Sequence, residues 1–451
     1  MENFTTKDIA DILGCECPVD CNVLDISTDT RAISQGSVFV ALKGANFDGH
    51  NFAKNAARAG ACAVVSQLEI EDIPCLVTDD TTKALGDIAR GYRNKFSPIL
   101  VGITGSVGKT TTKDMVALVL SEKYKTLKTQ GNLNNHIGLP KTLFGLDSTY
   151  EAAVIEMGMN HFGEIDYLTN IAKPNIAVIT NIGWSHIENL GSREGILKAK
   201  LEILNSMQDD MPLVINADDE MLFSQKSQLE RNIITYGIDN QNADIKAIDI
   251  NPGDSKTEFS IICGDEKCDI TLNATGTHNV LNALCAFAVG KNCGLENEQI
   301  QSALSKFKPN AMRQNVIKAN SISIIADCYN ASPDSMKAAL EMLNLQSGKR
   351  RIAVLGDMLE LGEYSKALHS AVGEYCAKSS ADMVFCVGAQ SKYIARSASL
   401  KGKAAKHFFN PETLIQTLKE TVCEGDVILF KASRGMHLEN VIKSLFGDII
   451  S

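Results

Sequence analysis

The chain has 451 residues, of which 44% are hydrophobic and 22% are charged, and its formal net charge is −10. This length exceeds one hydrophobic core and predicts about three domains of a soluble globular protein. The acidic balance argues against a nucleic-acid surface, which needs clustered Lys and Arg, but it leaves room for small anions in local basic pockets.

The amino-terminal stretch MENFTTKDIADILG carries acidic side chains and no apolar core, so we expect neither a signal peptide nor an anchor. No apolar run approaches the ~20 residues of a membrane span, and we expect a cytoplasmic protein. The 13 cysteines are scattered, and the cluster Cys15, Cys17 and Cys21 lacks the paired spacing of a zinc site. We therefore expect reduced, mostly buried thiols, as suits a reducing cytosol.

The predicted elements divide the chain into three α/β blocks. Residues 1–98 contain short strands and turns in VLDISTDTRAISQGSVFVAL and a helix that leads into a strand in NFAKNAARAGACAVV. Residues 99–307 alternate helices with the buried runs PILVGI, EAAVIEM, NIAVITNI and PLVINA, which predict parallel strands, and residues 243–272 predict an antiparallel ribbon. Residues 308–451 alternate helices with SISIIAD, RRIAVLGD, DMVFCVG and GDVILFKAS. The expected fold is a small N-terminal α/β domain, a central parallel-sheet domain and a C-terminal Rossmann-like doubly wound domain.

The stretch VGITGSVGKTTTKDMVALVL reads as a buried strand, a glycine loop and a helix. This geometry aims backbone N–H groups and a helix dipole at a phosphate, while Lys109 adds a charge and Thr110 a hydroxyl for magnesium. Ile103 stands where the full Walker A pattern has glycine, so the match is the shorter Gly105-x-x-Gly108-Lys109-Thr110. A tight turn that uses glycine for its backbone angles is the alternative. Because strand, loop, Lys and Thr coincide, we favour nucleotide binding.

Two polar residues follow later strands of the same block. Glu156 ends a buried strand, and the carboxyl ends of parallel strands share one edge with the phosphate loop. A carboxylate there suits magnesium, although a strand-end Glu alone is more often a cap or an ion pair. His186 lies just past the next strand and is either a metal ligand or a solvated loop residue.

Lys200 falls on the apolar face of a predicted helix. Ile196, Lys200, Ile203 and Met207 form one helical stripe, whereas Lys198 lies on another face. Desolvation on that face would lower the pKa of the amine. The alternative is a stem that carries its ammonium out to water.

Ten stretches in chain order resemble the Mur ligase superfamily, ATP-dependent amide-forming enzymes of peptidoglycan synthesis. They are TGSVGKTTTK, GNLNNHIGLP, EMGMNHFGEI, NIGWSHIENLGS, KAKLEI, GTHNVLNALCA, MRQ, DCYNASPDSMKAAL, VLGDMLELGEYS and KASRGMHLENVI. The stretches DTRAISQGSVFVALKGANFDGHNF, GNLNNHIG, DCYNASPDSM and GDMLELG are similar to the member that joins D-alanyl-D-alanine to UDP-N-acetylmuramoyl-tripeptide. The Asp-Asn-Pro-Arg signature of the ligase that adds the third amino acid is absent, and Ala432 stands where the family commonly has glycine.

The resemblance implies a ligase in which ATP converts the terminal carboxylate of the tripeptide to an acyl phosphate. The amine of the dipeptide then displaces phosphate, which gives the UDP-linked pentapeptide, ADP and phosphate. ATP and two magnesium ions are the implied cofactors, the two substrates are the implied partners, and the chain is expected to be a monomer.

The site residues that the resemblance implies fall into four groups. The catalytic group is Lys109, Glu156, His186, Lys200 and Arg313. The ATP-binding group is Thr104, Gly105, Ser106, Val107, Gly108, Lys109, Thr110, Thr111, Asn279, Asn282, Arg313, Asp327 and Asp357. The UDP-substrate group is Ser27, Thr30, Arg31, Lys43, Gly44, Asp48, His50, Asn134, Asn135 and His136. The metal ligands are Thr110 and Glu156 for one magnesium, and His186 and a carbamylated Lys200 for the second.

Alternatives remain at this point. Another amide ligase of the superfamily, such as folylpolyglutamate synthetase, would share the fold, and a P-loop kinase or a nucleotide-binding switch would share the loop. A kinase needs no second doubly wound unit, and a switch needs no D-alanyl-D-alanine. Without the resemblance, the residues of the first block read as a loop of turn formers, and Asp357 reads as a capping residue.

Overall fold

The computed structural model describes residues 1–44, 47–309, 315–319 and 321–449. The chain forms two compact units. Unit 1 comprises Met1–Thr104, Lys123–Val178 and Lys200–Leu213, and unit 2 comprises Gly105–Glu122, Ile179–Ala199 and Val214–Ser451. Helices and strands alternate through both units, as predicted for an α/β protein. The expected domain boundaries after residues 98 and 307 stay predictions.

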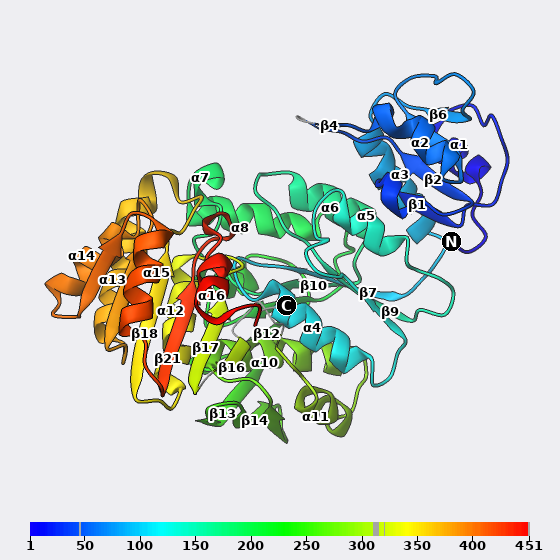
Figure 1. Ribbon diagram of the computed structural model, residues 1–451. Coiled ribbons are helices and arrows are strands. Elements are labelled where there is room, and N and C mark those ends of the chain that lie inside the picture. The colour runs from blue at the N-terminus through cyan, green and yellow to red at the C-terminus, as the bar shows by residue number, and fades with distance from the viewer. Residues whose placement is uncertain (45–46, 310–314, 320, 450–451) are drawn as a thin grey trace. The chain divides into compact units, whose positions relative to one another are not determined.

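Unit 1 begins with a four-stranded parallel sheet, drawn in blue in Figure 1. Its strands are β1 (Asp25–Ser27), β2 (Ser37–Val40), β5 (Ala61–Ser66) and β6 (Cys75–Val77), paired in that order. Its helices are α1 (Thr6–Leu13), α2 (Ala53–Arg58) and α3 (Thr81–Arg93). Phe39, Ala53 and Val64 belong to the core between α2 and the strands. The helix and strand predicted in NFAKNAARAGACAVV are thus confirmed.

The rest of unit 1 contains a second parallel arrangement. Strands β7 (Ile99–Thr104), β9 (Ala152–Glu156) and β8 (Thr126–Lys128) pair in the order β7-β9-β8, accompanied by α5 (Gly138–Leu143) and α6 (Glu164–Ala172). Every residue of β9 is buried, as expected for a strand covered on both faces. Strands β10 (Ile176–Ile179) and β11 (Leu213–Asn216) and helix α8 (Arg193–Leu201) cross the boundary between the units.

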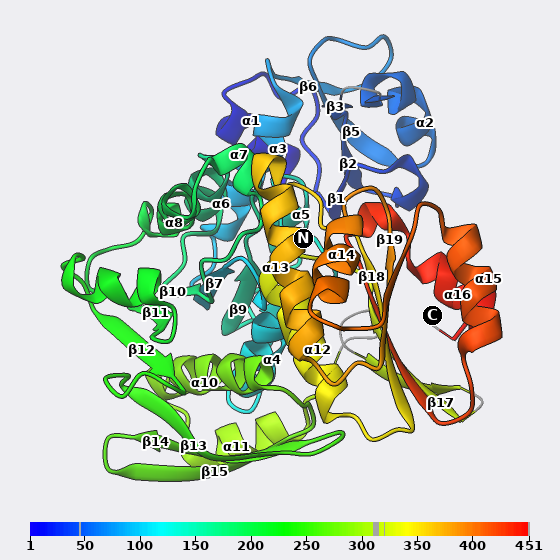
Figure 2. The ribbon, with the colours of Figure 1, turned by 90° about the vertical axis from the view of Figure 1, so that its left-hand side faces the viewer.

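In unit 2 the glycine loop leads into helix α4 (Lys109–Leu120). Its further elements before residue 309 are α7 (Ile187–Leu190), α9 (Glu220–Phe223), the 3-10 turn Ser224–Ser227, β12 (Ile233–Gly237), β13 (Ile245–Pro252), β14 (Thr257–Cys263), β15 (Glu266–Leu272), α10 (Thr277–Asn292) and α11 (Asn297–Ser305). The β13–β14 and β14–β15 pairs are antiparallel, which confirms the predicted ribbon. Figure 2 shows α10 and α11 beside it.

The C-terminal part of unit 2 is a six-stranded sheet in the order β16-β17-β21-β18-β19-β20. The strands are β16 (Asn315–Ala319), β17 (Ile322–Asp327), β18 (Arg350–Gly356), β19 (Met383–Val387), β20 (Ala405–Phe408) and β21 (Asp426–Lys431). Only β16 among these is antiparallel to its neighbour.

Helices cover both faces of this sheet (Figure 2). One face carries α12 (Pro333–Leu345), α13 (Ser365–Lys378) and α14 (Lys392–Leu400), and the other carries α15 (Pro411–Thr421) and α16 (Glu439–Phe446). Ser332 caps α12 and Pro333 occupies its first turn, where a missing N–H costs nothing. The doubly wound C-terminal sheet is therefore confirmed.

All 13 cysteines are free thiols. They are buried or half-buried except Cys423, which is exposed. Among the helices that the structure describes, none combines the length and the apolar character needed to cross a membrane.

Candidate functional site

The glycine loop has the backbone that the sequence predicts for a phosphate cradle. Gly105 has φ +151°, and a Cβ atom there would lie 1.8 Å from Oγ1 of Thr180, so no larger residue fits. Gly108 has φ +84° and forms the N-cap of α4 in the left-handed region. Lys109 and Thr110 are the first residues of α4, and the N-terminus of a helix directs backbone N–H groups and the positive end of its dipole along the axis, which suits an anion.

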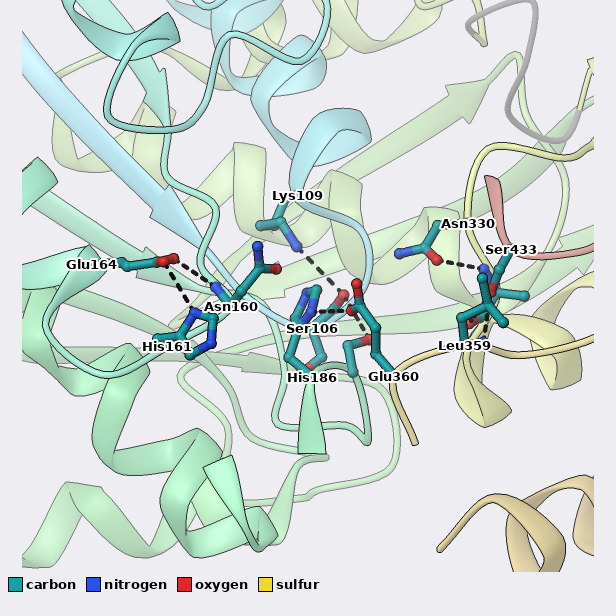
Figure 3. A network of polar contacts seen from close by, with 12 residues as sticks. Ser106, Lys109, Asn160, His161, Glu164, His186, Asn330, Leu359, Glu360 and Ser433 are labelled. Carbon is teal, nitrogen blue, oxygen red and sulfur yellow. Dashed lines mark hydrogen bonds and ion pairs between the residues drawn. The ribbon is translucent and has the colours of Figure 1, made fainter. Parts of the chain in front are cut away.

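A second loop, just after β10, holds the glycine loop in place. The Ser106 backbone N–H donates to the carbonyl of Asn181 (3.1 Å), and the Val107 N–H donates to its side-chain oxygen (2.9 Å). Lys109 spans the loop, because its ammonium donates to the carbonyls of Gly105 (2.7 Å) and Ser106 (3.4 Å; Figure 3). Asn181 was missed by sequence reasoning. The signal was its place at the end of the run NIAVITNI, a strand predicted to end at the same edge.

Asn279 and Asn282 lie on one buried face of α10, as their spacing predicts. The amide of Asn282 donates to Oδ1 of Asn279 (3.4 Å), and the amide of Asn279 donates to the Thr275 carbonyl (2.8 Å). Oδ1 of Asn282 also accepts from the hydroxyl of Thr112 on α4 (3.0 Å). This contact places the asparagine pair against the helix that opens with Lys109.

In unit 1, Glu156 ends β9 beside the end of β7. Ile103 and Glu156 are partners in the parallel register, and the carboxylate is only 2% exposed. Its Oε1 atom accepts a hydrogen bond from the side-chain amide of Asn134 (2.8 Å). The prediction that Glu156 sits at the carboxyl edge of the strands is confirmed. The hydrogen bond also brings Asn134, which the resemblance assigns to the UDP-substrate group, next to Glu156, which it assigns to the metal ligands.

Lys200 is 1% exposed, so the prediction that it is buried is confirmed and the water-reaching alternative is wrong. The predicted stripe needs a correction, because α8 ends at Leu201 and a 3-10 turn occupies Glu202–Leu204. Ile203 and Met207 are therefore buried without lying on the same α-helix as Lys200. A shift from 3.6 to 3 residues per turn changes which positions share a face, and hydrophobic spacing alone does not reveal it.

Two predicted residues of the C-terminal sheet have defined partners. Oδ2 of Asp327 accepts from the ammonium of Lys431 (2.8 Å), which also donates to the Asn330 carbonyl (2.9 Å). Oδ1 of Asp357 accepts from the backbone N–H groups of Gln390 (3.0 Å) and Ser391 (2.6 Å), so this carboxylate caps a loop. Arg313 lies outside the described residues.

Ala432 fits its position because Gly356, which lies beside it in space, has no side chain. A Cβ atom on Gly356 would lie 2.6 Å from Cβ of Ala432, which is buried. The methyl group therefore occupies space left by Gly356 on the adjacent strand.

The predicted UDP-substrate residues of the first block gather at one edge of the four-stranded sheet. Ser27 ends β1, and Thr30 and Arg31 follow in a 3-10 turn (Thr30–Ala32). After β2 come the short strands β3 (Lys43–Gly44) and β4 (Phe47–Asp48) and the turn Gly49–Phe52, which holds His50. All four strands are parallel, so these segments lie outside their carboxyl ends, where open α/β sheets bind ligands.

Hydrogen bonds fix two side chains, His50 and Arg31, at this edge. Nδ1 of His50 lies 2.6 Å from Oδ1 of Asp48, and its Nε2 accepts from the Gln67 backbone N–H (2.9 Å), which ties the loops after β2 and β5 together. The guanidinium of Arg31 donates to Asp29 (2.7 Å), and this bond lowers the pKa of Asp29 to about 2. Arg31 is exposed and so can face an anion.

Unit 1 also contains a pocket of about 410 Å³ that includes two predicted substrate residues. Asn135 and His136 contribute to its wall, and α3 contributes Lys83. The wall further includes Tyr167, whose hydroxyl is buried without a hydrogen-bond partner; burial raises its pKa to about 12. The remaining lining residues are Asp80, Thr82, Gly158, Phe162, Gly163, Glu164 and Leu168. Amide, imidazole, ammonium and phenol groups around one pocket can bind an anionic or peptidic molecule.

Comparison with known proteins agrees with this arrangement. Family models match in three places: "Mur ligase family, catalytic domain" at residues 23–93, "Mur ligase middle domain" at 103–290, and "Mur ligase, glutamate ligase domain" at 312–434. The UDP-N-acetylmuramoyl-tripeptide–D-alanyl-D-alanine ligase of Bacillus subtilis (strain 168) is 41% identical over 434 residues, which cover 94% of each chain. The Escherichia coli (strain K12) protein of the same name is 36% identical over 99% of each chain.

Solved structures agree as well. The crystal structure of MurF from Acinetobacter baumannii superposes with a TM-score of 0.90 at 31% identity and 98% coverage of both chains. MurF from Thermotoga maritima, solved in complex with ADP, gives a TM-score of 0.84 at 30% identity, with 93% of this chain and 96% of that chain covered. Both the glycine-loop geometry and this similarity along the chain lead to one assignment: the chain belongs to the Mur ligase family.

Proposed function

We propose that the protein is an ATP-dependent ligase that joins D-alanyl-D-alanine to UDP-N-acetylmuramoyl-tripeptide in the cytoplasm. The observation that carries this proposal is the 41% identity to a ligase of that name over 94% of both chains. Three matched family domains and the phosphate-type loop support the ligase chemistry. In the reaction, the terminal carboxylate of the tripeptide takes the γ-phosphoryl group of ATP, and the amine of the dipeptide then displaces phosphate to form the new amide.

The residues of the glycine loop fit the triphosphate of ATP. Gly105 and Gly108 carry no side chains that could obstruct an approach to the loop backbone, and the N-terminus of α4 offers N–H donors. Lys109 would exchange its bonds to the loop carbonyls for the phosphate oxygens. Asn279 and Asn282, which lie against α4, are proposed to contact the adenine base.

Magnesium is proposed at Thr110 and Glu156, because a hydroxyl and a carboxylate are oxygen donors of the kind it prefers. It would draw electron density from the phosphate oxygens and reduce the repulsion between the two reacting anions. His186 and Lys200 are proposed to serve a second magnesium ion.

Lys200 is proposed to work as a carbamate. Its ammonium would first lose one proton. The neutral amine would then attack the carbon of carbon dioxide, forming an N–C bond as one C=O π bond opens, and would lose a second proton, so that a cation becomes a carboxylate-like anion. The supporting observation is its burial, since only 1% of Lys200 is exposed and a buried amine favours the neutral form that reacts. Lys200→Ala should lose activity, and acetate or formate should restore part of it. Full activity of this variant without added carboxylate would remove Lys200 from the mechanism.

The edge of the four-stranded sheet and the 410 Å³ pocket are proposed to bind the UDP-substrate. Arg31, Lys43 and His50 would face the diphosphate, and Asn135 and His136 would contact the muramoyl peptide. Lys43→Ala should therefore raise the KM for the UDP-substrate and leave the KM for ATP unchanged.

Phosphate release tests the whole proposal. The protein should release phosphate from ATP in the presence of UDP-N-acetylmuramoyl-tripeptide only when D-alanyl-D-alanine is added. Folylpolyglutamates and single amino acids serve as controls. Release that ignores the dipeptide, or that needs a different carboxylate substrate, would refute the assignment.

A further inference from the structure

The ring of His50 has a partner for each of its two nitrogens. The backbone N–H of Gln67 donates to Nε2 (2.9 Å), and Nδ1 lies 2.6 Å from Oδ1 of Asp48. A backbone N–H can only donate, so Nε2 is the nitrogen without a proton. The neutral ring therefore carries its proton on Nδ1, where the Asp48 carboxylate accepts it.

These bonds join separate segments at the carboxyl edge of the four-stranded sheet. His50 lies in the turn Gly49–Phe52 after β4, and Gln67 directly follows β5. The side-chain amide of Gln67 continues the link, because it donates to the carbonyl of Asp79 after β6 (2.7 Å). The His50 side chain is only 10% exposed, so the bridge is largely shielded from water. One imidazole thus holds together loops that follow three neighbouring strands.

The turn that carries His50 packs directly on the chain after β2. The N–H of Gly49 donates to the carbonyl of Leu42 (2.7 Å). A Cβ atom on Gly49 would lie 2.8 Å from that carbonyl oxygen, which is too close for a larger residue. The ring of His50 therefore reaches Gln67 from a backbone whose place is fixed.

On the other side of the ring, the bridge reaches Lys43. Oδ1 of Asp48 accepts from the backbone N–H of His50 (3.0 Å) as well as from its ring, while Oδ2 lies 4.0 Å from the ammonium of Lys43. Lys43 and Asp48 are also partners in the antiparallel pair β3–β4. The Lys43 side chain is 62% exposed, so its ammonium can reach a ligand. The place of this cation depends on Asp48, and the place of Asp48 depends on His50.

We propose that His50 is a positioning residue, which bridges the loops after β2 and β5 through both ring nitrogens and so places Lys43, without touching the substrate itself. The inference rests on the proposed function, in which these residues lie at the diphosphate of the UDP-substrate. A His50 that donated to a phosphate oxygen from Nε2 would need a second proton there, and the Gln67 N–H would lose its acceptor. The bridging role needs neither change. His50 thus acts on the substrate through Lys43.

The protonation of the ring tests the bridge directly. The full chain is labelled with ¹⁵N in its histidine rings, and the signals of His50 are identified by their loss in His50→Gln. At about pH 8, above the ordinary pKa of imidazole, the wild type should show protonated Nδ1 and unprotonated Nε2. Saturating UDP-N-acetylmuramoyl-tripeptide should leave this pattern unchanged. A proton on Nε2, either in the free chain or only when the substrate is bound, overturns the inference.

The exchange rate of the Gln67 amide tests the far end of the bridge. Gln67 is an exposed residue, so we expect its N–H to owe its protection to the acceptor on His50. His50→Ala should raise this rate at least about 10-fold, and an unchanged rate overturns the inference. His50→Gln, whose amide oxygen can take the place of Nε2, should fall between Ala and wild type. Asn51→Ala, at an exposed position in the same turn, should leave the rate at the wild-type value.

Steady-state kinetics test whether His50 acts through Lys43. His50→Ala should raise the KM for the UDP-substrate about 10-fold, as expected for lost hydrogen bonds, with kcat and the KM for ATP unchanged. His50→Ala combined with Lys43→Ala should have the KM of Lys43→Ala alone, because the effect of the ring needs the ammonium. An unchanged KM in His50→Ala, or KM increases that multiply in the double variant, overturns the inference. A wild type without dipeptide-dependent phosphate release refutes the proposed function instead.

Discussion

Replacing Lys431 by methionine should destabilise the C-terminal sheet strongly, because it leaves the carboxylate of Asp327 without its cation. The Asp327 side chain is 10% exposed and that of Lys431 is 1% exposed, and the two lie 2.8 Å apart on adjacent, paired strand positions. Removing one partner of such a buried pair costs about 3–5 kcal/mol. Lys443→Met, at a pair with Asp448 that is 64% and 74% exposed, should cost at most about 1 kcal/mol.

The double variant Asp327→Leu with Lys431→Met separates the two contributions. It removes both buried charges. The remaining loss of stability comes mainly from the Asn330 carbonyl, which no longer receives the hydrogen bond from Lys431, and is about 1–3 kcal/mol. The double variant should therefore be more stable than Lys431→Met alone. Hydrogen exchange of the β17 and β21 amides at increasing denaturant reports the free energy of unfolding of the C-terminal sheet. A single unfolding curve of a multidomain chain does not give this quantity. A cost below about 1 kcal/mol for Lys431→Met, or a double variant no better than the single one, would refute the reasoning.

Three further predictions concern the loop, the asparagine pair and pH. Lys109→Ala should lower kcat at least about 100-fold while the circular dichroism spectrum stays native, because the Lys109 ammonium stabilises negative charge on the phosphoryl group during its transfer. An unchanged kcat would contradict the assignment of the glycine loop as a nucleotide site. Asn279→Ala should raise the KM for ATP more than that for the dipeptide, and equal increases would count against an adenine contact. Burial lowers the pKa of His369 below 6.5, so the folded chain favours the neutral ring. This contribution to stability is complete above the unfolded pKa of about 6.5 and is lost as pH falls towards the lower folded pKa. The denaturation midpoint should therefore fall less between about pH 7.5 and pH 5 in His369→Gln than in the wild type. An identical pH dependence of the midpoint in both proteins would contradict this role of His369.

The ends of the buried strands could be predicted from the sequence, because such strands appear as short apolar runs and the carboxyl ends of parallel strands lie at one edge of their sheet. This rule placed Glu156 beside the end of β7 and the residues after β1 and β2 at one edge. It could not give the partners of those residues. Asn134 and Glu156 are 22 positions apart, and only the folded loop brings the amide to the carboxylate.

Glu360 shows why contacts between distant loops escape sequence reasoning. The motif GDMLELG contains both Asp357 and Glu360, and its sequence pattern points to Asp357, which follows the strand. The structure uses Asp357 to cap a loop and turns Glu360 towards His186. The turn depends on a left-handed φ at a non-glycine residue, and neither hydrophobic period nor composition encodes that choice.

The distribution of thiols makes the native chain ready for site-directed probes. Cys423 is the exposed cysteine, just after α15, whereas burial raises the pKa of Cys285, Cys328 and Cys376 to about 12 and keeps them protonated. Since the thiolate is the form that reacts, a maleimide dye should attach first at Cys423. A fluorophore there would travel with the six-stranded sheet, and a partner dye near the amino terminus would report its distance as ligands bind. Domain movement could thus be followed by energy transfer without building a cysteine-free background.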